Sequence, residues 1–277
     1  MDDRPTRRVV LPVFAVILFW TGAAMLAQAA GAHGWKAAVL YTLIEAAMLL
    51  GLVSVAFRAG YPLRRVFGPR PSSSVVASAV ASSIPLLALE LGIVWALLAV
   101  LSRLNPSAAK WVLEISTTNP FAELGTGPLS FVFQTIFLAV LVPITEELAF
   151  RGLLFGRLAE RWGTLRALLL TSALFAILHL DPIGKFAFAF VCGLLYLGSG
   201  SLWAPIALHA ANNFFALAIP DVDVPDYQPG SASPGGDWLG AVFLISGVVW
   251  FILFAIARRN LWHRLPAGSH PHTRTEP

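Results

Sequence analysis

Long runs of apolar residues, separated by short polar segments, make up most of the chain. A helix needs about 20 apolar residues to cross the hydrocarbon core of a bilayer. The runs are continuous and do not alternate, so they do not fit the strands of a transmembrane β-barrel. Because lipid cannot satisfy backbone hydrogen bonds, the pattern predicts an all-α polytopic transmembrane helix bundle. About eight spans are predicted, at residues 9–30, 36–57, 75–101, 128–156, 164–180, 183–198, 202–219 and 238–257.

Three of these spans depart from a simple crossing. The span at 128–156 is long and carries charge in its last turns, so we expect it to project beyond the membrane. The spans at 183–198 and 202–219 are short and are joined by a Gly-Ser-Gly-Ser segment, which allows a tilted or partly re-entrant arrangement. We predict that the first span is retained, although Ala27-Gln28-Ala29 resembles a signal-peptidase site, because its apolar run is longer than a usual signal h-region.

Composition and charge support a membrane protein. The chain is 57% hydrophobic and 12% charged, whereas roughly a quarter of the residues of a soluble domain are charged. Its net charge of +4 lies in clusters beside the apolar runs, which indicates topology signals and no nucleic-acid partner. With both termini inside, the basic residues of the inner segments are Arg4, Arg7, Arg8, Arg58, Arg64, Arg65, Arg70, Arg157, Arg161, Arg166, Arg258, Arg259, Arg264 and Arg274, and those of the outer segments are Lys36, Arg103, Lys110 and Lys185. This asymmetry predicts a multi-pass protein of the cell membrane with both termini cytoplasmic.

The segments between the spans suggest no further domain. Residues 221–237 are acidic and rich in Pro, Gly and Ser, and the tail at about 265–277 is polar, so both are predicted to be flexible. We therefore predict a single membrane domain over residues 1–277. Cys192 is the only cysteine, which excludes a disulfide or a cysteine-based metal site within one chain, and we expect it to be a buried core thiol.

Ionisable residues occur deep inside the fourth span. Glu146, Glu147 and Arg151 lie there within six residues. Each charged residue near a helix centre costs about 2.5 to 3.5 kcal/mol, so the group must face the interior of the bundle. Glu147 and Arg151 are four residues apart on one helix face and predict an ion pair. Glu146 points about 100° away and is left without a local partner.

A second polar residue is expected at the depth of Glu146. The turn between the fourth and fifth spans falls near Trp162 and Gly163. Glu146 precedes Trp162 by sixteen residues, and His179 follows Gly163 by sixteen. An antiparallel hairpin would therefore bring Glu146 and His179 to the same depth.

The seventh span adds His209, Asn212 and Asn213. Each polar feature also has a structural explanation: the Glu147–Arg151 pair can stabilise its helix, His209 can be a packing residue, and either asparagine can hydrogen-bond a neighbouring helix. Together, an unpaired glutamate, two histidines and an amide on three spans predict a functional site inside the bundle.

Two hydrolytic mechanisms are open for this set. In the first, Glu146 takes a proton from a water that His179 helps to hold, while His209 and Asn213 donate hydrogen bonds to the developing oxyanion. In the second, Glu146, His179 and His209 hold a divalent metal such as zinc that activates the water. The chain lacks the H-E-x-x-H motif that would favour zinc.

The motifs Glu146-Glu147-x-x-x-Arg151, Phe175-x-x-x-His179 and His209-x-x-x-Asn213 follow one another on successive predicted spans. This ordered set resembles the CPBP family, which comprises the CAAX proteases, the Rce1-like proteins and bacteriocin-processing enzymes. The resemblance covers about residues 128–219, which would be the catalytic core, and it agrees with eight spans. It implies an intramembrane endopeptidase acting on membrane-associated peptides or proteins, including lipidated ones.

The resemblance also implies roles for the residues. Glu146 would activate water with His179, and His209 and Asn213 would form the oxyanion site. Glu147 and Arg151 would support them. Members of the family have been described both as metalloproteases and as glutamate-dependent enzymes, so a metal-free mechanism and a metal-dependent one both remain open.

Two other classes of function compete with a peptidase. A non-catalytic scaffold or bacteriocin-immunity protein would tolerate Glu146→Gln. A proton-coupled transporter would use the buried carboxylates as relays, but it would be expected to show paired half-helices or two similar halves, and the sequence shows neither. The substrate and the oligomeric state leave no mark on the sequence.

Overall fold

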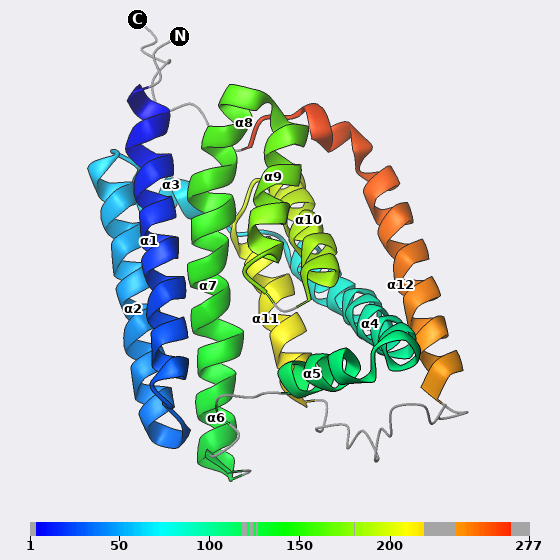
Figure 1. The fold of residues 1–277 in the computed structure, drawn as a ribbon. Helices are drawn as coiled ribbons and strands as arrows, with labels where there is room; N and C mark the ends of the chain where they lie inside the picture. Colours follow the sequence, from blue (N-terminus) through cyan, green and yellow to red (C-terminus); the bar gives the residue numbers. More distant parts are fainter. Residues whose placement is uncertain are drawn as a thin grey trace, which may run out of the picture.

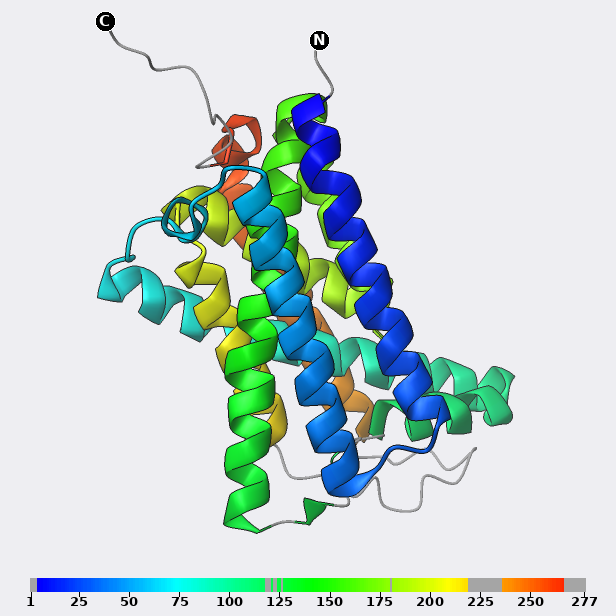
Figure 2. The ribbon, with the colours of Figure 1, turned by 90° about the vertical axis from the view of Figure 1, so that its left-hand side faces the viewer.

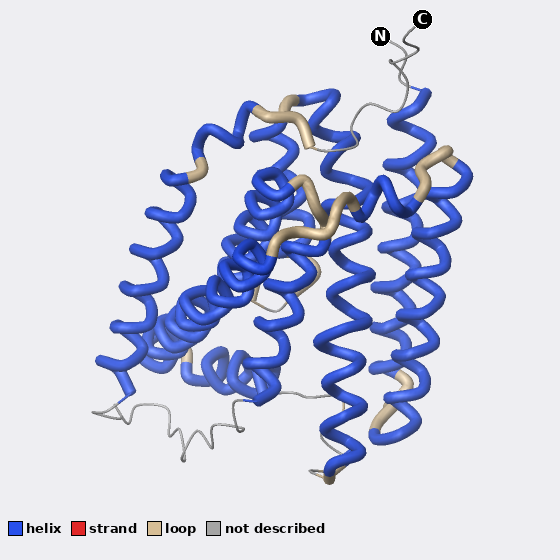
Figure 3. The backbone as a smooth tube through the Cα atoms, turned by 180° about the vertical axis from the view of Figure 1, so that it is seen from behind, coloured by secondary structure: helices blue, strands red, loops and turns tan. Residues whose placement is uncertain are grey.

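The computed structural model describes residues 4–117, 121, 124–125, 127–179, 181–218 and 236–266. In these residues the regular structure is entirely helical, which confirms the predicted all-α membrane bundle (Figure 3). In chain order the elements are α1 (Arg4–Ala29), α2 (Gly34–Arg58), α3 (Leu63–Phe67), α4 (Ser73–Leu104), α5 (Pro106–Thr117), α6 (Pro128–Ile136), η2 (Phe137–Leu141), α7 (Val142–Glu147), η3 (Leu148–Phe155), α8 (Gly156–Trp162), α9 (Thr164–Ala176), α10 (Pro182–Ser199), α11 (Trp203–Ala218), α12 (Gly236–Ala257) and η4 (Arg259–His263). Residues 221–235 of the predicted loop at 221–237, and residues 267–277 of the predicted tail, lie outside the described residues, and Gly236 and Asp237 begin α12.

Each of the eight predicted spans coincides with helical structure, but the helices differ in reach. Six are long and apolar enough to cross a membrane: α1, α2, α4, the continuous run from α6 to α8, α10 and α12. The other two are shorter, because α9 has 13 residues and α11 has 16. At 1.5 Å per residue, α9 is only about 20 Å long. The span predicted at 164–180 extends four residues beyond the helix, which ends at Ala176.

The elements pack as a bundle around the long α6–α8 column (Figures 1 and 2). The α1–α2 hairpin lies on one side of this column, with α1 against η3 and α2 against α7. On the other side, α10 packs against α9, α4 and α11, and α12 packs mainly against α4. The first turns of α1 and the segment η4 lie at the same end of the bundle, as an even number of crossings requires (Figure 1). Which end faces the cytoplasm remains a prediction.

The turn that makes the central hairpin lies where the sequence suggests. Gly163 separates α8 from α9 and has a positive φ of 83°, a conformation that glycine adopts without a steric penalty. The two helices it joins run antiparallel and pack against each other (Figure 1). This hairpin and α10 form the centre of the core, where Phe155, Phe175 and Phe188 are fully buried. Cys192 is also buried there, as predicted.

Candidate active site

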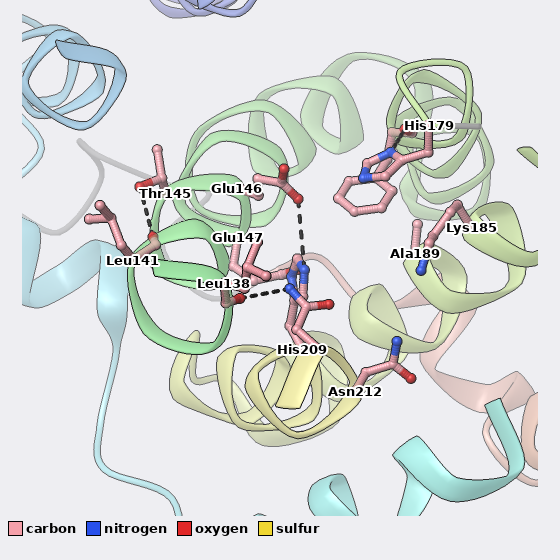
Figure 4. A network of polar contacts seen from close by, with 12 residues as sticks. Leu138, Leu141, Thr145, Glu146, Glu147, His179, Lys185, Ala189, His209 and Asn212 are labelled. Carbon is pink, nitrogen blue, oxygen red and sulfur yellow. Dashed lines mark hydrogen bonds and ion pairs between the residues drawn. The ribbon is translucent and has the colours of Figure 1, made fainter. Parts of the chain in front are cut away.

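Glu147 is the centre of a buried polar network (Figure 4). Arg151 Nη1 donates to Glu147 Oε1 at 2.8 Å, so the predicted ion pair is present, with 2% and 0% of the two side chains exposed. His209 Nδ1 lies 3.0 Å from the same oxygen. Arg151 Nη2 donates to the backbone carbonyl of Ala189 in α10 at 2.8 Å. A buried charge is tolerated when it is paired and hydrogen-bonded, and here the contacts tie α7 to α11 and η3 to α10.

Glu146 is buried beside this network but is not locked into it. The residue is 4% exposed, and its Oε2 has no hydrogen-bond partner among the described residues. The nearest imidazole atom is Nε2 of His209, 3.8 Å from Oε2, which is too long for a direct hydrogen bond. Adjacent in sequence, the two glutamates therefore differ: Oε1 of Glu147 is held by Arg151 and His209, although its Oε2 lacks a partner in the described residues, whereas Glu146 has no side chain within hydrogen-bonding distance of its Oε2.

His179 lies beyond the end of α9, in the connector that leads to α10. Its ring stacks on Phe175, with centroids 4.4 Å apart, and Nδ1 is 2.8 Å from the Phe175 carbonyl oxygen. Because a carbonyl only accepts, Nδ1 carries the proton and Nε2 of the neutral ring is an acceptor. Figure 4 places His179 and Glu146 around the same network, but no hydrogen bond or ion pair joins them in the described part of the chain.

Asn213 uses its amide to hold a backbone carbonyl, and its predicted role as an oxyanion donor stays a prediction. Its Nδ2 donates to the Leu138 carbonyl oxygen at 2.8 Å. This carbonyl lies in η2, a π-helical segment, where the Val142 N–H turns back to Phe137. The residue five positions after Leu138 is Pro143, which has no N–H to donate. Asn213 thus satisfies a carbonyl that the proline leaves unpaired.

Two acids that sequence reasoning missed also lie inside the bundle. Glu90 in α4 accepts a hydrogen bond from Lys185 Nζ at 3.0 Å and faces Asn212 Nδ2 at 3.4 Å. Glu45 in α2 is 1% exposed and accepts from Trp20 Nε1 at 2.8 Å. Each is a single carboxylate within an apolar span. The energetic cost of placing a charge there is the signal that could have identified them from the sequence.

The metal set predicted from the sequence, Glu146, His179 and His209, stays a prediction. Across the described ranges, no group of three His, Cys, Asp or Glu side chains is arranged to hold an ion. Nδ1 of His209 is hydrogen-bonded to Glu147 and Nδ1 of His179 to a backbone carbonyl, so Nε2 is the ring nitrogen that each histidine could offer to a metal. A tetrahedral zinc site needs at least three protein ligands converging at about 2 Å. The set also fits acid–base chemistry, since a carboxylate oxygen without a hydrogen-bond partner lies 3.8 Å from an imidazole nitrogen of His209.

The fold and these residues define a polytopic α-helical membrane protein with a buried glutamate and histidine centre. Residues 128–215 match the family described as type II CAAX prenyl endopeptidase Rce1-like. This segment contains the α6–α8 column, α9, α10 and most of α11, and therefore all six predicted site residues. The resemblance that the three motifs indicate is thus confirmed: in residues 128–215 the chain is Rce1-like.

One curated relative supports the same class. The chain is 30% identical over 121 residues to "Putative membrane peptidase YdiL" of Bacillus subtilis (strain 168). The alignment covers 41% of this chain and 50% of that protein, so the chain spans about half the length of the curated relative that it matches. No solved structure matches the chain.

Proposed function

We propose that this protein is a membrane-embedded endopeptidase that hydrolyses peptide bonds with a water activated by Glu146. The observation that carries the proposal is the buried Glu146 carboxylate oxygen, which has no hydrogen-bond partner in the described residues and lies 3.8 Å from His209 Nε2. Glu146 lies in residues 128–215, the segment that matches the Rce1-like family. A partnerless buried carboxylate is costly, and a general base must keep its oxygen free for the proton it takes.

The proposed reaction assigns each proton. Glu146 removes a proton from water while Nε2 of His179 accepts a hydrogen bond from the same water. The hydroxyl oxygen attacks the peptide carbonyl, and the oxyanion receives a hydrogen bond from Nε2 of His209 in its protonated form. Glu147, beside Nδ1 of His209, stabilises that form. When the tetrahedral intermediate collapses, Glu146 returns its proton to the departing amine. Arg151 holds Glu147 in place.

The substrate is proposed from the name of the matched family. Type II CAAX prenyl endopeptidase points to a membrane-associated peptide that carries a lipid, and such a peptide is the first one to test. We further propose that the protein resides in the cell membrane with both termini cytoplasmic, as its charge asymmetry indicates. Asn213 has, in this proposal, a positioning role through Leu138.

The test is cleavage by purified protein. Wild type, Glu146→Gln and His179→Ala are assayed in detergent with quenched peptides, with and without a prenyl group. Loss of the base is expected to reduce kcat by about a hundredfold or more. Glu160→Gln is the matched control, because Glu160 lies in α8 and pairs with Arg157 at 2.8 Å. Wild-type cleavage by Glu146→Gln would contradict the proposal and favour a scaffold or immunity role.

The same sample decides whether a metal takes part. Zinc analysis and treatment with a chelator are carried out before the assay. In the proposed mechanism, activity survives chelation. Stoichiometric zinc, with activity lost on chelation and restored by zinc, would replace it with a metal mechanism.

A further inference from the structure

Lys185 and Glu90 form a second polar contact beside the candidate active site, and no motif of the sequence includes them. Lys185 lies in the first turn of α10, and its Nζ is 3.0 Å from Glu90 Oε1. The two side chains are 23% and 10% exposed. Gly184 allows this close approach, because a Cβ there would lie 2.9 Å from Glu90 Cγ. Glu90 is outside residues 128–215, so the match to the family does not cover this pair.

The ammonium of Lys185 lies beside the candidate active site. Figure 4 shows Lys185 on α10, on the side of the network where His179 also lies. Its Nζ lies 5.4 Å from the centre of the Phe188 ring, and this ring is 4.9 Å from His209. Lys185 is thus a partly exposed cation at the edge of an otherwise buried site.

Lys185 also has N–H donors beyond the one that binds Glu90. An ammonium has three N–H donors. Glu90 is the hydrogen-bond acceptor that the described residues provide for it. The amide of Asn213 uses one of its two N–H donors on the Leu138 carbonyl oxygen. Lys185 therefore has N–H groups that could bind a further acceptor at this side of the site.

We propose that Lys185 is a further substrate-contacting residue, whose ammonium binds an anionic oxygen of the peptide, and that Glu90 positions it. This inference rests on the proposed peptidase function and deepens it. The oxygen has two sources with the same chemistry: the oxyanion of the tetrahedral intermediate, or a carboxylate of the substrate. A preorganised donor aimed at an oxyanion lowers the barrier, whereas a donor to a substrate carboxylate strengthens binding.

Kinetics on two matched peptides distinguish these sources. The peptides share one sequence and end in a carboxylate or a carboxamide. If Lys185 binds the oxyanion, Lys185→Met lowers kcat by about a hundredfold on both peptides. If it binds the carboxylate, Lys185→Met raises KM about tenfold for the acid peptide alone. Either result supports the proposal, and Lys185→Arg, which keeps the charge, is expected to restore part of the loss.

Control variants distinguish a failure of the Lys185 proposal from a failure of the proposed peptidase function. Lys36→Met removes an exposed lysine of α2 and is expected to leave both constants unchanged. If Lys185→Met keeps wild-type kcat and KM on both peptides while Glu146→Gln is inactive, the ion pair only joins α4 to α10 and this proposal is wrong. If Glu146→Gln is as active as wild type, the peptidase mechanism itself fails.

The role of Glu90 is tested by a double-mutant cycle. Glu90→Gln is expected to weaken catalysis because Lys185 loses its anchor, and Glu90→Asp to restore part of it. The double variant Glu90→Gln/Lys185→Met leaves no buried charge unpaired, so it guards against misfolding of the single variants. A positioning residue adds no loss once its target is gone, so the double variant should match Lys185→Met. Additive losses would show that Glu90 does not act through Lys185.

Discussion

Helices α10 and α12 are both apolar and both long enough to cross a membrane, yet they differ in where they lie. Of the six candidate spans, α10 has the lowest hydropathy and the largest buried share, 67% of its best window. Helix α12 has the highest hydropathy, and 17% of its window is buried. In a soluble protein the order would be the reverse. The most apolar helix lies on the outside of this bundle, and the less apolar one lies in its centre.

The reason is that lipid replaces water as the surroundings. Lipid tails are as apolar as leucine, so apolarity does not draw a helix into the interior. Polar groups do, because they need partners that lipid cannot supply. Helix α10 receives Arg151 at the Ala189 carbonyl and carries Lys185, which pairs with Glu90. Helix α12 packs mainly against α4, at closely approaching backbones.

Replacement of Arg151 should have the largest effect on stability. Arg151→Met leaves the Glu147 carboxylate buried without its guanidinium and frees the Ala189 carbonyl. Removing one partner of a buried ion pair costs about 3 to 5 kcal/mol. We expect a loss of this size in unfolding measurements in detergent. Arg166→Met is the control, because Arg166 is exposed, and it should change stability by no more than about 0.5 kcal/mol. Equal losses for the two variants would show that α10 is not held by its polar contacts.

Separation of α12 from α4 should have a smaller effect. A Cβ on Gly247 would lie 2.6 to 2.8 Å from Leu89 Cβ, Cα and N, so Gly247→Val forces two backbones apart. Overpacking of this kind costs about 1 to 3 kcal/mol. The control is Gly22→Val in α1, where a Cβ would meet no atom within 4 Å. Thermal unfolding in the same detergent measures both. If Gly247→Val is as stable as Gly22→Val, close approach does not hold α12 in place.

Much of the fold could be predicted because span length depends on lipid thickness alone. All eight apolar runs are helical, and the turn at Gly163 lies where the sequence predicts it. The end of α9 could not be predicted, because Ile177 and Leu178 are apolar and yet lie in the connector before His179. The short helices α3 and α5 were also missed, since neither is long enough to register as a span.

In the candidate site, contacts between residues close in sequence could be predicted, and contacts between distant residues could not. The Glu147–Arg151 pair follows from a spacing of four residues on one helix. The contact of Glu90 with Lys185 joins residues 95 apart, and no spacing rule indicates it. The direction of the Asn213 amide depends on a carbonyl that Pro143 leaves unpaired in another helix. One sequence identifies the polar residues of a bundle, whereas their pairing requires its tertiary structure.

The smallest effect is expected on the outer face of α12, and it tests the comparison most directly. Leu253 is 61% exposed on α12, whereas Leu194 is fully buried in α10. Truncation of Leu194 to alanine leaves a cavity and should cost about 2 to 5 kcal/mol. Leu253→Ala creates no enclosed cavity, because lipid or detergent occupies the vacated space, and it should cost no more than about 0.5 kcal/mol. Both variants make the same chemical change and are measured by unfolding in the same micelles. Equal losses would mean that burial within the bundle does not set the contribution of a leucine, and that the contrast between α10 and α12 has no energetic consequence.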